Sequence, residues 1–214
     1  MSTVEMIDED HIGTSLKTPM RKDAFEINDD RKIELIEKHF KEIMHILGLD
    51  LKDDSLSGTP YRVAKMYVKE IFSGLNPANK PAVKLFENKY DYNEILIEKN
   101  ITLYSYCEHH FVPIIGKVHV AYISNGEVIG LSKINRLVQY FAKRPQVQER
   151  LTNQIAEGLK EALQSDDVAV LVDAIHLCVS SRGIKDTNTS TITAHYSGKF
   201  LDEKRKTEFI SLTK

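Results

Sequence analysis

The first periodic segment of the chain is "NDDRKIELIEKHFKEIMHILGLD", residues 28–50. Its apolar side chains recur at three- and four-residue steps, the spacing of one face of an α-helix; they are Ile33, Ile36, Phe40, Ile43 and Leu47. Asp29 or Asp30 can cap the start of this helix, and Gly48 suits its end. The pattern therefore predicts an amphipathic helix here.

A second helix is predicted in "GTPYRVAKMYVKEIFSGL", residues 58–75. Thr59 is a plausible N-cap with Pro60 at the first helical position, and Gly74 can end the helix. Arg62 and Lys65 are three residues apart, so they share one face of its first turns. On this stretch alone, the simpler interpretation of the pair is a solvated basic edge.

From about residue 95 the pattern changes to that of β-strands. Two β-rich runs, "EILIEKNITLYSYC" and "IIGKVHVAYIS", are followed by two segments with helical stripes and then by two more β-rich runs. The helical segments are "LSKINRLVQYFAKR" and "PQVQERLTNQIAEGLKEAL", and the closing runs are "DVAVLVDAIHLCV" and "TSTITAHYSGKF". The order strand, strand, helix, helix, strand, strand favours an α+β unit with two helices on one face of an antiparallel sheet.

These patterns divide the chain into three parts. Residues 1–28 lack periodicity and are rich in Asp, Glu, Thr and Ser, which is typical of a mobile tail. Residues 29–94 form the expected N-terminal helical region, and residues 95–214 form the expected α+β domain.

Charge and composition limit the partners. The chain has 29 basic and 31 acidic side chains, so no global attraction to nucleic acid or to an anionic membrane is expected. Apolar stretches fall short of the roughly 20 residues that span a bilayer, and the start "MSTVEMIDEDHIGTSLKTP" is no secretory signal. A cytoplasmic location follows, where cysteines are expected as thiols or thiolate ligands.

One of the two cysteines lies in "YCEHHFVP", residues 106–113. Cys107 and His110 have the spacing C-x-x-H, which allows a thiolate and an imidazole to bind one metal ion across a tight turn. An exposed polar turn with a bystander cysteine would have the same sequence, so the spacing alone leaves both interpretations open.

The other cysteine lies in "HLCVSSRG", residues 176–183. His176 and Cys178 are two apart on an expected strand, so both would project to one face, either as ordinary core residues or as ligands. Two thiolates plus the His110 imidazole would suit zinc with a fourth position left to water, which loses a proton near neutral pH when bound. His109 and His176 would remain for proton transfer. This is a hydrolytic set of groups.

Basic residues suggest an anion site. Each is by itself an ordinary surface charge, but together they resemble a polyphosphate clamp; they are Arg62, Lys65, Lys133, Arg136 and Arg182. The chain has no G-x-x-x-x-G-K-[ST], so the clamp would not be a P-loop.

Three long motifs in order closely resemble the GTP cyclohydrolase I family: "CEHHFVPIIGKVHVAYI", "GLSKINRLVQYFAKRPQVQERLT" and "HLCVSSRGI". The resemblance runs from about residue 31 to 210. It implies a tunnelling fold and a homo-oligomer, commonly a decamer of two face-to-face pentamers with active sites at subunit interfaces. It also implies hydrolysis of GTP to 7,8-dihydroneopterin triphosphate and formate, the first step of folate and tetrahydropterin biosynthesis.

The resemblance assigns roles by position. The zinc ligands match Cys107, His110 and Cys178, and the catalytic histidines match His109 and His176. The carboxylate that recognises guanine matches Glu149, with Gln148 beside it in the substrate pocket, and the ribose contact matches Ser132. The triphosphate contacts match Arg62, Lys65, Lys133, Arg136 and Arg182.

Three alternatives remain for comparison. A structural zinc module in a homo-oligomeric scaffold would need a closed site of four protein ligands, whereas the best count here is three. A tunnelling-fold nitrile reductase of the queuosine route would need a different nucleophilic cysteine and a nicotinamide site, which these motifs do not resemble. A zinc nucleobase deaminase would need H-x-E with P-C-x-x-C, and neither pattern occurs.

Overall fold

The computed structural model describes residues 15–214, so the first fourteen residues of the expected N-terminal tail lie outside the described part. The N-terminal helical region contains α1 (Asp29–Ile46), the short α2 (Asp54–Ser57) and α3 (Thr59–Met66). α3 continues into a π-helical turn, η1 (Tyr67–Ile71), and into two 3₁₀ turns, η2 (Ser73–Leu75) and η3 (Pro77–Asn79). Both expected long helices are therefore present.

The helix ends differ slightly from the expectation. The side chain of Asn28, and not that of Asp29 or Asp30, caps α1 by accepting a hydrogen bond from the backbone N–H of Arg31 at 2.9 Å. Gly58 takes the N-cap position of α3, with Thr59 as the first helical residue. The expected end at Gly74 lies within η2, where an added Cβ would come 2.0 Å from the carbonyl oxygen of Tyr140. Only glycine therefore allows this close approach to the backbone of Tyr140.

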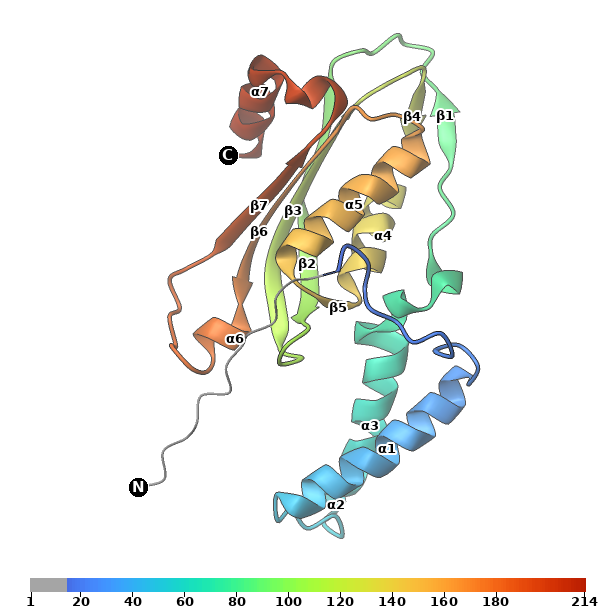
Figure 1. Ribbon diagram of the computed structural model, residues 1–214, viewed down its shortest axis with the longest axis vertical. Helices are drawn as coiled ribbons and strands as arrows, with labels where there is room; N and C mark the ends of the chain where they lie inside the picture. Colours follow the sequence, from blue (N-terminus) through green and yellow to red (C-terminus); the bar gives the residue numbers. More distant parts are fainter. Residues whose placement is uncertain (1–14) are drawn as a thin grey trace.

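The second half of the chain folds into a five-stranded sheet of order β5-β2-β3-β6-β7 (Figure 1). The strands are β2 (Ile95–Cys107), β3 (Pro113–Ile123), β5 (Pro145–Gln146), β6 (Val168–His176) and β7 (Thr191–Tyr196). Four of them pair antiparallel, as expected. The two-residue β5, which the sequence did not predict, pairs parallel to β2, so the sheet is mixed at this edge.

Two helices cover one face of the sheet, α4 (Leu131–Ala142) and α5 (Gln148–Leu163), as the sequence predicts (Figure 1). Their apolar stripes are buried against the strands; fully buried examples are Ile134 and Leu137 of α4 and Leu151, Ile155 and Leu159 of α5. The burial of these stripes provides the main core of the domain.

Five further elements were not expected. β6 ends at His176, and Leu177–Ser180 form a helical turn, α6, so the prediction that Cys178 lies on a strand was wrong. A short second sheet pairs β1 (Leu85–Glu87) with β4 (Glu127–Ile129). After β7 comes the 3₁₀ turn η4 (Gly198–Leu201) and then α7 (Glu203–Thr213) (Figure 1). Phe209 of α7 belongs to a second apolar cluster.

The expected domain boundary between residues 94 and 95 stays a prediction. β1 lies before this boundary and pairs with β4, which lies after it. Among the residues that the structure describes, no helix is both long and apolar enough to cross a membrane.

Candidate active site and metal centre

The turn between β2 and β3 builds one end of the site. The backbone N–H of Phe111 donates to the carbonyl of Cys107 at 2.9 Å, and the N–H of Cys107 donates to the carbonyl of Val112 at 2.9 Å. Phe111 has a left-handed backbone with φ of 55°. The chain therefore reverses within a few residues and holds His109 and His110 at the end of the sheet.

Cys107, His110 and Cys178 come together at this end. One potential ligand atom from each lies within 4.8 Å of the others. Cys178 reaches the group from α6, because β6 pairs with β3 in a register that sets His176 opposite Ile114. The pairing of β3 with β6 therefore brings Cys178 of α6 to Cys107 and His110 of the turn.

The chemistry of this group fits a metal ion. Burial raises the pKa of the Cys178 thiol, and the nearby Cys107 raises it further. A thiolate pair in this setting needs a cation to compensate its charge, and two sulfurs with one imidazole are the donors that a borderline metal such as zinc prefers.

His176 lies beside the group and is oriented by Gln148. Its Nε2 is 2.7 Å from Oε1 of Gln148, whose amide nitrogen donates to the carbonyl oxygens of Thr191 at 2.8 Å and Val172 at 3.2 Å. Because carbonyls only accept, the amide oxygen must face His176, so Nε2 carries the proton and Nδ1 is left for other chemistry. Burial lowers the pKa of His176, and the Glu149 carboxylate opposes that shift.

His109 and Glu108 complete the turn. Nδ1 of His109 is 3.6 Å from Sγ of Cys107, and its Nε2 is 3.9 Å from Oε1 of Glu108. Both Nη groups of Arg150 bind the Glu108 carboxylate, and the side chain of Arg150 is only 2% exposed. Sequence reasoning missed this arginine, although its position three residues after Val147 places it beside the apolar stripe of α5.

Part of the expected anion clamp lies close to the metal group. Nη1 of Arg182 is 2.9 Å from Nε2 of His110. Lys65 is exposed on α3, two residues before Tyr67, whose ring centroid is 6.5 Å from that of Phe111 in the turn. Arg62 is exposed on the same helix, where its Nη2 lies 3.2 Å from Oγ1 of Thr59. Glu149 is exposed at the start of α5.

The remaining expected contacts do not reach the metal group in the same chain. α4 runs along β2, because Asn135 bonds Glu98, Gln139 bonds the carbonyl of Thr102, and Ser105 bonds the carbonyl of Ala142. Glu98 precedes Cys107 by nine strand residues, or roughly 25–30 Å at about 3.3 Å each. Ser132 and Lys133, one turn before Asn135, therefore lie far from Cys107. Arg136, which follows Asn135 on α4, is exposed and lines a groove together with Gly74 and Lys143.

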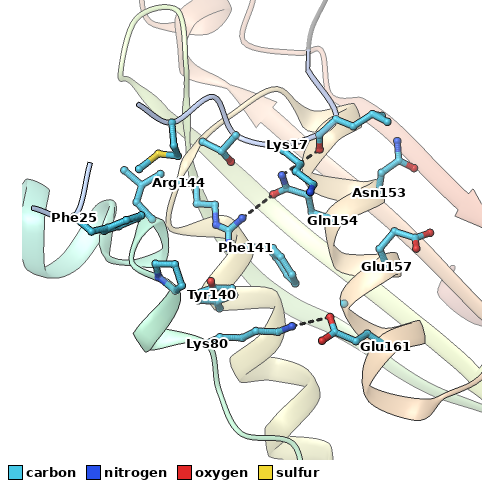
Figure 2. Close-up of a pocket in the computed structure, with 16 residues that line it drawn as sticks. Lys17, Phe25, Lys80, Tyr140, Phe141, Arg144, Asn153, Gln154, Glu157 and Glu161 are labelled. Carbon is cyan, nitrogen blue, oxygen red and sulfur yellow. Dashed lines mark hydrogen bonds and ion pairs between the residues drawn. The ribbon is translucent and has the colours of Figure 1, made fainter. Parts of the chain in front are cut away.

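A large cavity lies elsewhere in the described part of the chain. It has a volume of about 950 Å³ and is formed between the segment 16–25 and the helices α4 and α5 (Figure 2). Lys80 and Glu161 form an ion pair at one side, with Nζ to Oε2 at 2.7 Å, and Arg144 stacks on Tyr140 within the wall.

Antiparallel strands backed by two helices, with a Cys–His–Cys group and two imidazoles at one end of the sheet, define an enzyme of the tunnelling-fold class with a candidate metal centre. The family model described as GTP cyclohydrolase I matches residues 36–214. The chain belongs to the GTP cyclohydrolase I family, and the expected family and fold are confirmed.

Individual relatives agree with this assignment. GTP cyclohydrolase 1 of Flavobacterium johnsoniae is 58% identical over 211 residues, covering 99% of this chain and 95% of that protein. The same enzyme from Citrobacter koseri is 51% identical and from Escherichia coli 52% identical, each over 195 residues, with 91% of this chain and 88% of theirs covered. The archaeosine synthase QueF-Like in the apo form is a similar solved structure, with 20% identity and a TM-score of 0.41, covering 49% of this chain and 93% of that one.

Proposed function

We propose that this chain is an active GTP cyclohydrolase I that hydrolyses GTP to 7,8-dihydroneopterin triphosphate and formate. The observation that carries the proposal is the group of Cys107, His110 and Cys178, with ligand atoms within 4.8 Å of one another. Two imidazoles and a guanidinium lie beside this group, in a chain that belongs to the family. The proposal includes a cytoplasmic location and a role in folate or tetrahydropterin biosynthesis.

The proposed metal is zinc, held by Cys107, His110 and Cys178. When bound, zinc supplies Lewis-acid activation of water at neutral pH. The carbon to be attacked is C8 of guanine, which two nitrogens flank and which leaves as formate after ring opening and a second hydrolysis.

His176 is proposed to supply the proton that N7 of guanine needs before attack at C8. Because Gln148 engages Nε2, the proton would be passed from Nδ1. This gives Gln148 a role in orienting His176. His109, beside Cys107, is the group proposed for proton transfer in the later steps, when the ribose opens and recloses on the amines.

Glu149 is proposed to select guanine. The N1–H and the 2-amino group of guanine are adjacent donors that one carboxylate can pair in a fork, and adenine offers neither. Its exposed position at the start of α5, next to Gln148, supports this role.

The distance between the start of α4 and Cys107 supports a homo-oligomer with active sites between subunits. Ser132 contacts ribose and Lys133 contacts triphosphate in the proposed scheme, yet both lie roughly 25–30 Å from Cys107 of the same chain by strand spacing. A separation of this size exceeds the length of one GTP molecule, so these residues would serve the metal centre of another copy. The apolar side chains of Ile43 and Ile46 on α1 and of Leu47 directly after it are exposed, Ile46 by 81%, as expected for a surface that another copy covers. The proposed assembly is a decamer of two pentamers.

The test is to incubate the full-length, zinc-loaded protein with GTP and to measure formate and dihydroneopterin triphosphate together. Equal amounts of both products are expected. The variant Cys178→Ser should lose both zinc, measured by elemental analysis, and turnover, whereas the neighbouring Ser180→Ala should keep both. A zinc-loaded protein that releases no formate would favour the structural zinc module, and full zinc occupancy in Cys178→Ser would remove this residue from the ligands.

A further inference from the structure

Arg150 is a charge placed inside the protein, with its side chain 2% exposed. A buried guanidinium is costly unless its donors are satisfied. Two groups satisfy it. The Glu108 carboxylate accepts from both Nη groups, and the carbonyl of Ser15 accepts from Nε at 2.7 Å.

The first of these partners lies inside the metal-binding turn. Glu108 directly follows Cys107 and lies two residues before His110. Its backbone N–H donates to the carbonyl of Gln146 at 3.0 Å, so the turn is held to β5 by its backbone and to α5 by its side chain. Any movement of Glu108 would therefore shift both ligands that the turn supplies.

The ion pair with Arg150 also keeps the Glu108 carboxylate from acting as a metal ligand. Carboxylates are good zinc ligands, and Glu108 lies next to one ligand in sequence. Its oxygens are not members of the group formed by Cys107, His110 and Cys178. Because Arg150 engages both carboxylate oxygens, Glu108 would not be available as a fourth protein ligand if Cys107, His110 and Cys178 hold zinc.

The second partner ties the N-terminal segment to the same arginine. Residues 15–25, which we call the strap, cross α5 and form one wall of the large cavity. Besides the bond from Arg150 to Ser15, Nε2 of Gln154 lies 3.4 Å from the carbonyl of Leu16 (Figure 2). Arg150 thus joins the strap, the first turn of α5 and the metal-binding turn.

We propose that Arg150 is a positioning residue of the metal centre: its ion pair with Glu108 holds the turn so that Cys107 and His110 face Cys178, and the strap completes its hydrogen bonding through Ser15. This rests on the proposed metal centre. Arg150 acts on the ion through the orientation of the turn. Mutation of residues that orient metal ligands without binding the metal typically lowers metal affinity about 10–100-fold.

The experiment measures zinc affinity of the full-length protein by competition with a chromophoric chelator, and the absorption spectrum of bound cobalt. Arg150→Met is expected to weaken zinc about 10–100-fold and to change the cobalt spectrum. The matched control is Arg144→Met. Arg144 is also a partly buried arginine, with its guanidinium 4.5 Å from the Tyr140 ring centroid, and its hydrogen bonds go to the carbonyl of Gly74 and to Gln154, outside the turn. The control should lower the melting temperature and leave both metal readouts unchanged.

A double-mutant cycle separates positioning from general destabilisation. In a Glu108→Gln background, Arg150→Met should weaken zinc much less than it does in the wild type, because the pair is already broken. Zinc affinity or a cobalt spectrum indistinguishable from wild type in Arg150→Met would overturn the proposal. If that variant does not fold, wild-type zinc affinity in Glu108→Gln, whose side chain is 20% exposed, would overturn it equally. Normal zinc binding by Cys178→Ser would instead count against the metal centre itself.

Discussion

Two inactive variants of this chain should restore activity to each other when they assemble together. One variant, Cys178→Ser, lacks a proposed metal ligand, and the other, Lys133→Ala, lacks a proposed triphosphate contact. The reasoning rests on the distance along β2, where the level of Lys133 is roughly 25–30 Å from Cys107. If one GTP molecule meets both residues, they must belong to different copies.

The expected recovery follows from counting. Assume that equal amounts of the two chains assemble at random into a symmetric oligomer. Each site then has a probability of roughly one half of receiving an intact set of metal ligands from one copy and roughly one half of receiving an intact Lys133 from another. Roughly a quarter of the wild-type activity should therefore return. If one chain supplied the whole site, no chain in the mixture would be intact. The mixture would then show only the residual activity of its parents.

The assay uses chains with two different affinity tags, purified in sequence so that only mixed assemblies remain, and measures formate release from GTP. The control mixes Cys107→Ser with Cys178→Ser. Both changes fall in the metal half, so no site is intact and no recovery is expected. Mixed assemblies of the first pair that are no more active than their parents would refute the reasoning.

Three further outcomes are expected. Glu149→Gln should keep its zinc while GTP turnover collapses, because sites built on such pairing typically reject a mismatch by several kcal/mol; normal turnover would place guanine recognition elsewhere. Arg182→Ala should weaken GTP far more than guanosine in binding assays, because the lost contact is to phosphate, and equal losses would indicate a structural role. Burial, aided by Lys117, lowers the pKa of His119 from its usual 6.5. As the pH falls, the unfolded chain therefore protonates His119 before the folded chain does, so the contribution of this histidine to folding stability is full above pH 6.5 and is lost at lower pH. In His119→Leu the melting temperature should fall less steeply with acid than in the wild type. An unchanged slope would show that His119 does not contribute to the loss of stability in acid.

The elements that the sequence predicts well are those with long periodic patterns. α4 and α5 bury their apolar stripes as expected, and the long strands pair as expected. The missed elements carry no such signal. α7 buries only Phe209, so it has no stripe, and α6 is a single turn inside an apolar run that is typical of a strand. β5 is two residues long and is defined only by its partner.

The site was predictable to the extent that its residues are neighbours in sequence. Cys107 and His110 are three apart, and their spacing allows a metal site without requiring one. The approach of Cys178 depends on the pairing of β3 with β6, and the contact of Glu108 with Arg150 joins residues 42 positions apart. Neither can be inferred from a local pattern, because both depend on how distant segments pack.

The first turn of α5 limits how this protein can change over evolution. Gln148 reaches His176, Arg150 reaches Glu108, and Glu149 between them faces solvent. Successive helical residues project about 100° apart, so these directions depend on the phase of the helix. A single residue inserted between Gln148 and Arg150 would turn one of these side chains by about 100° relative to the other, so they could not reach His176 and Glu108 together. This segment can therefore diverge by substitution while its length stays constant, whereas the exposed turn around Gly126, which has open space around it, can gain or lose residues without affecting the site.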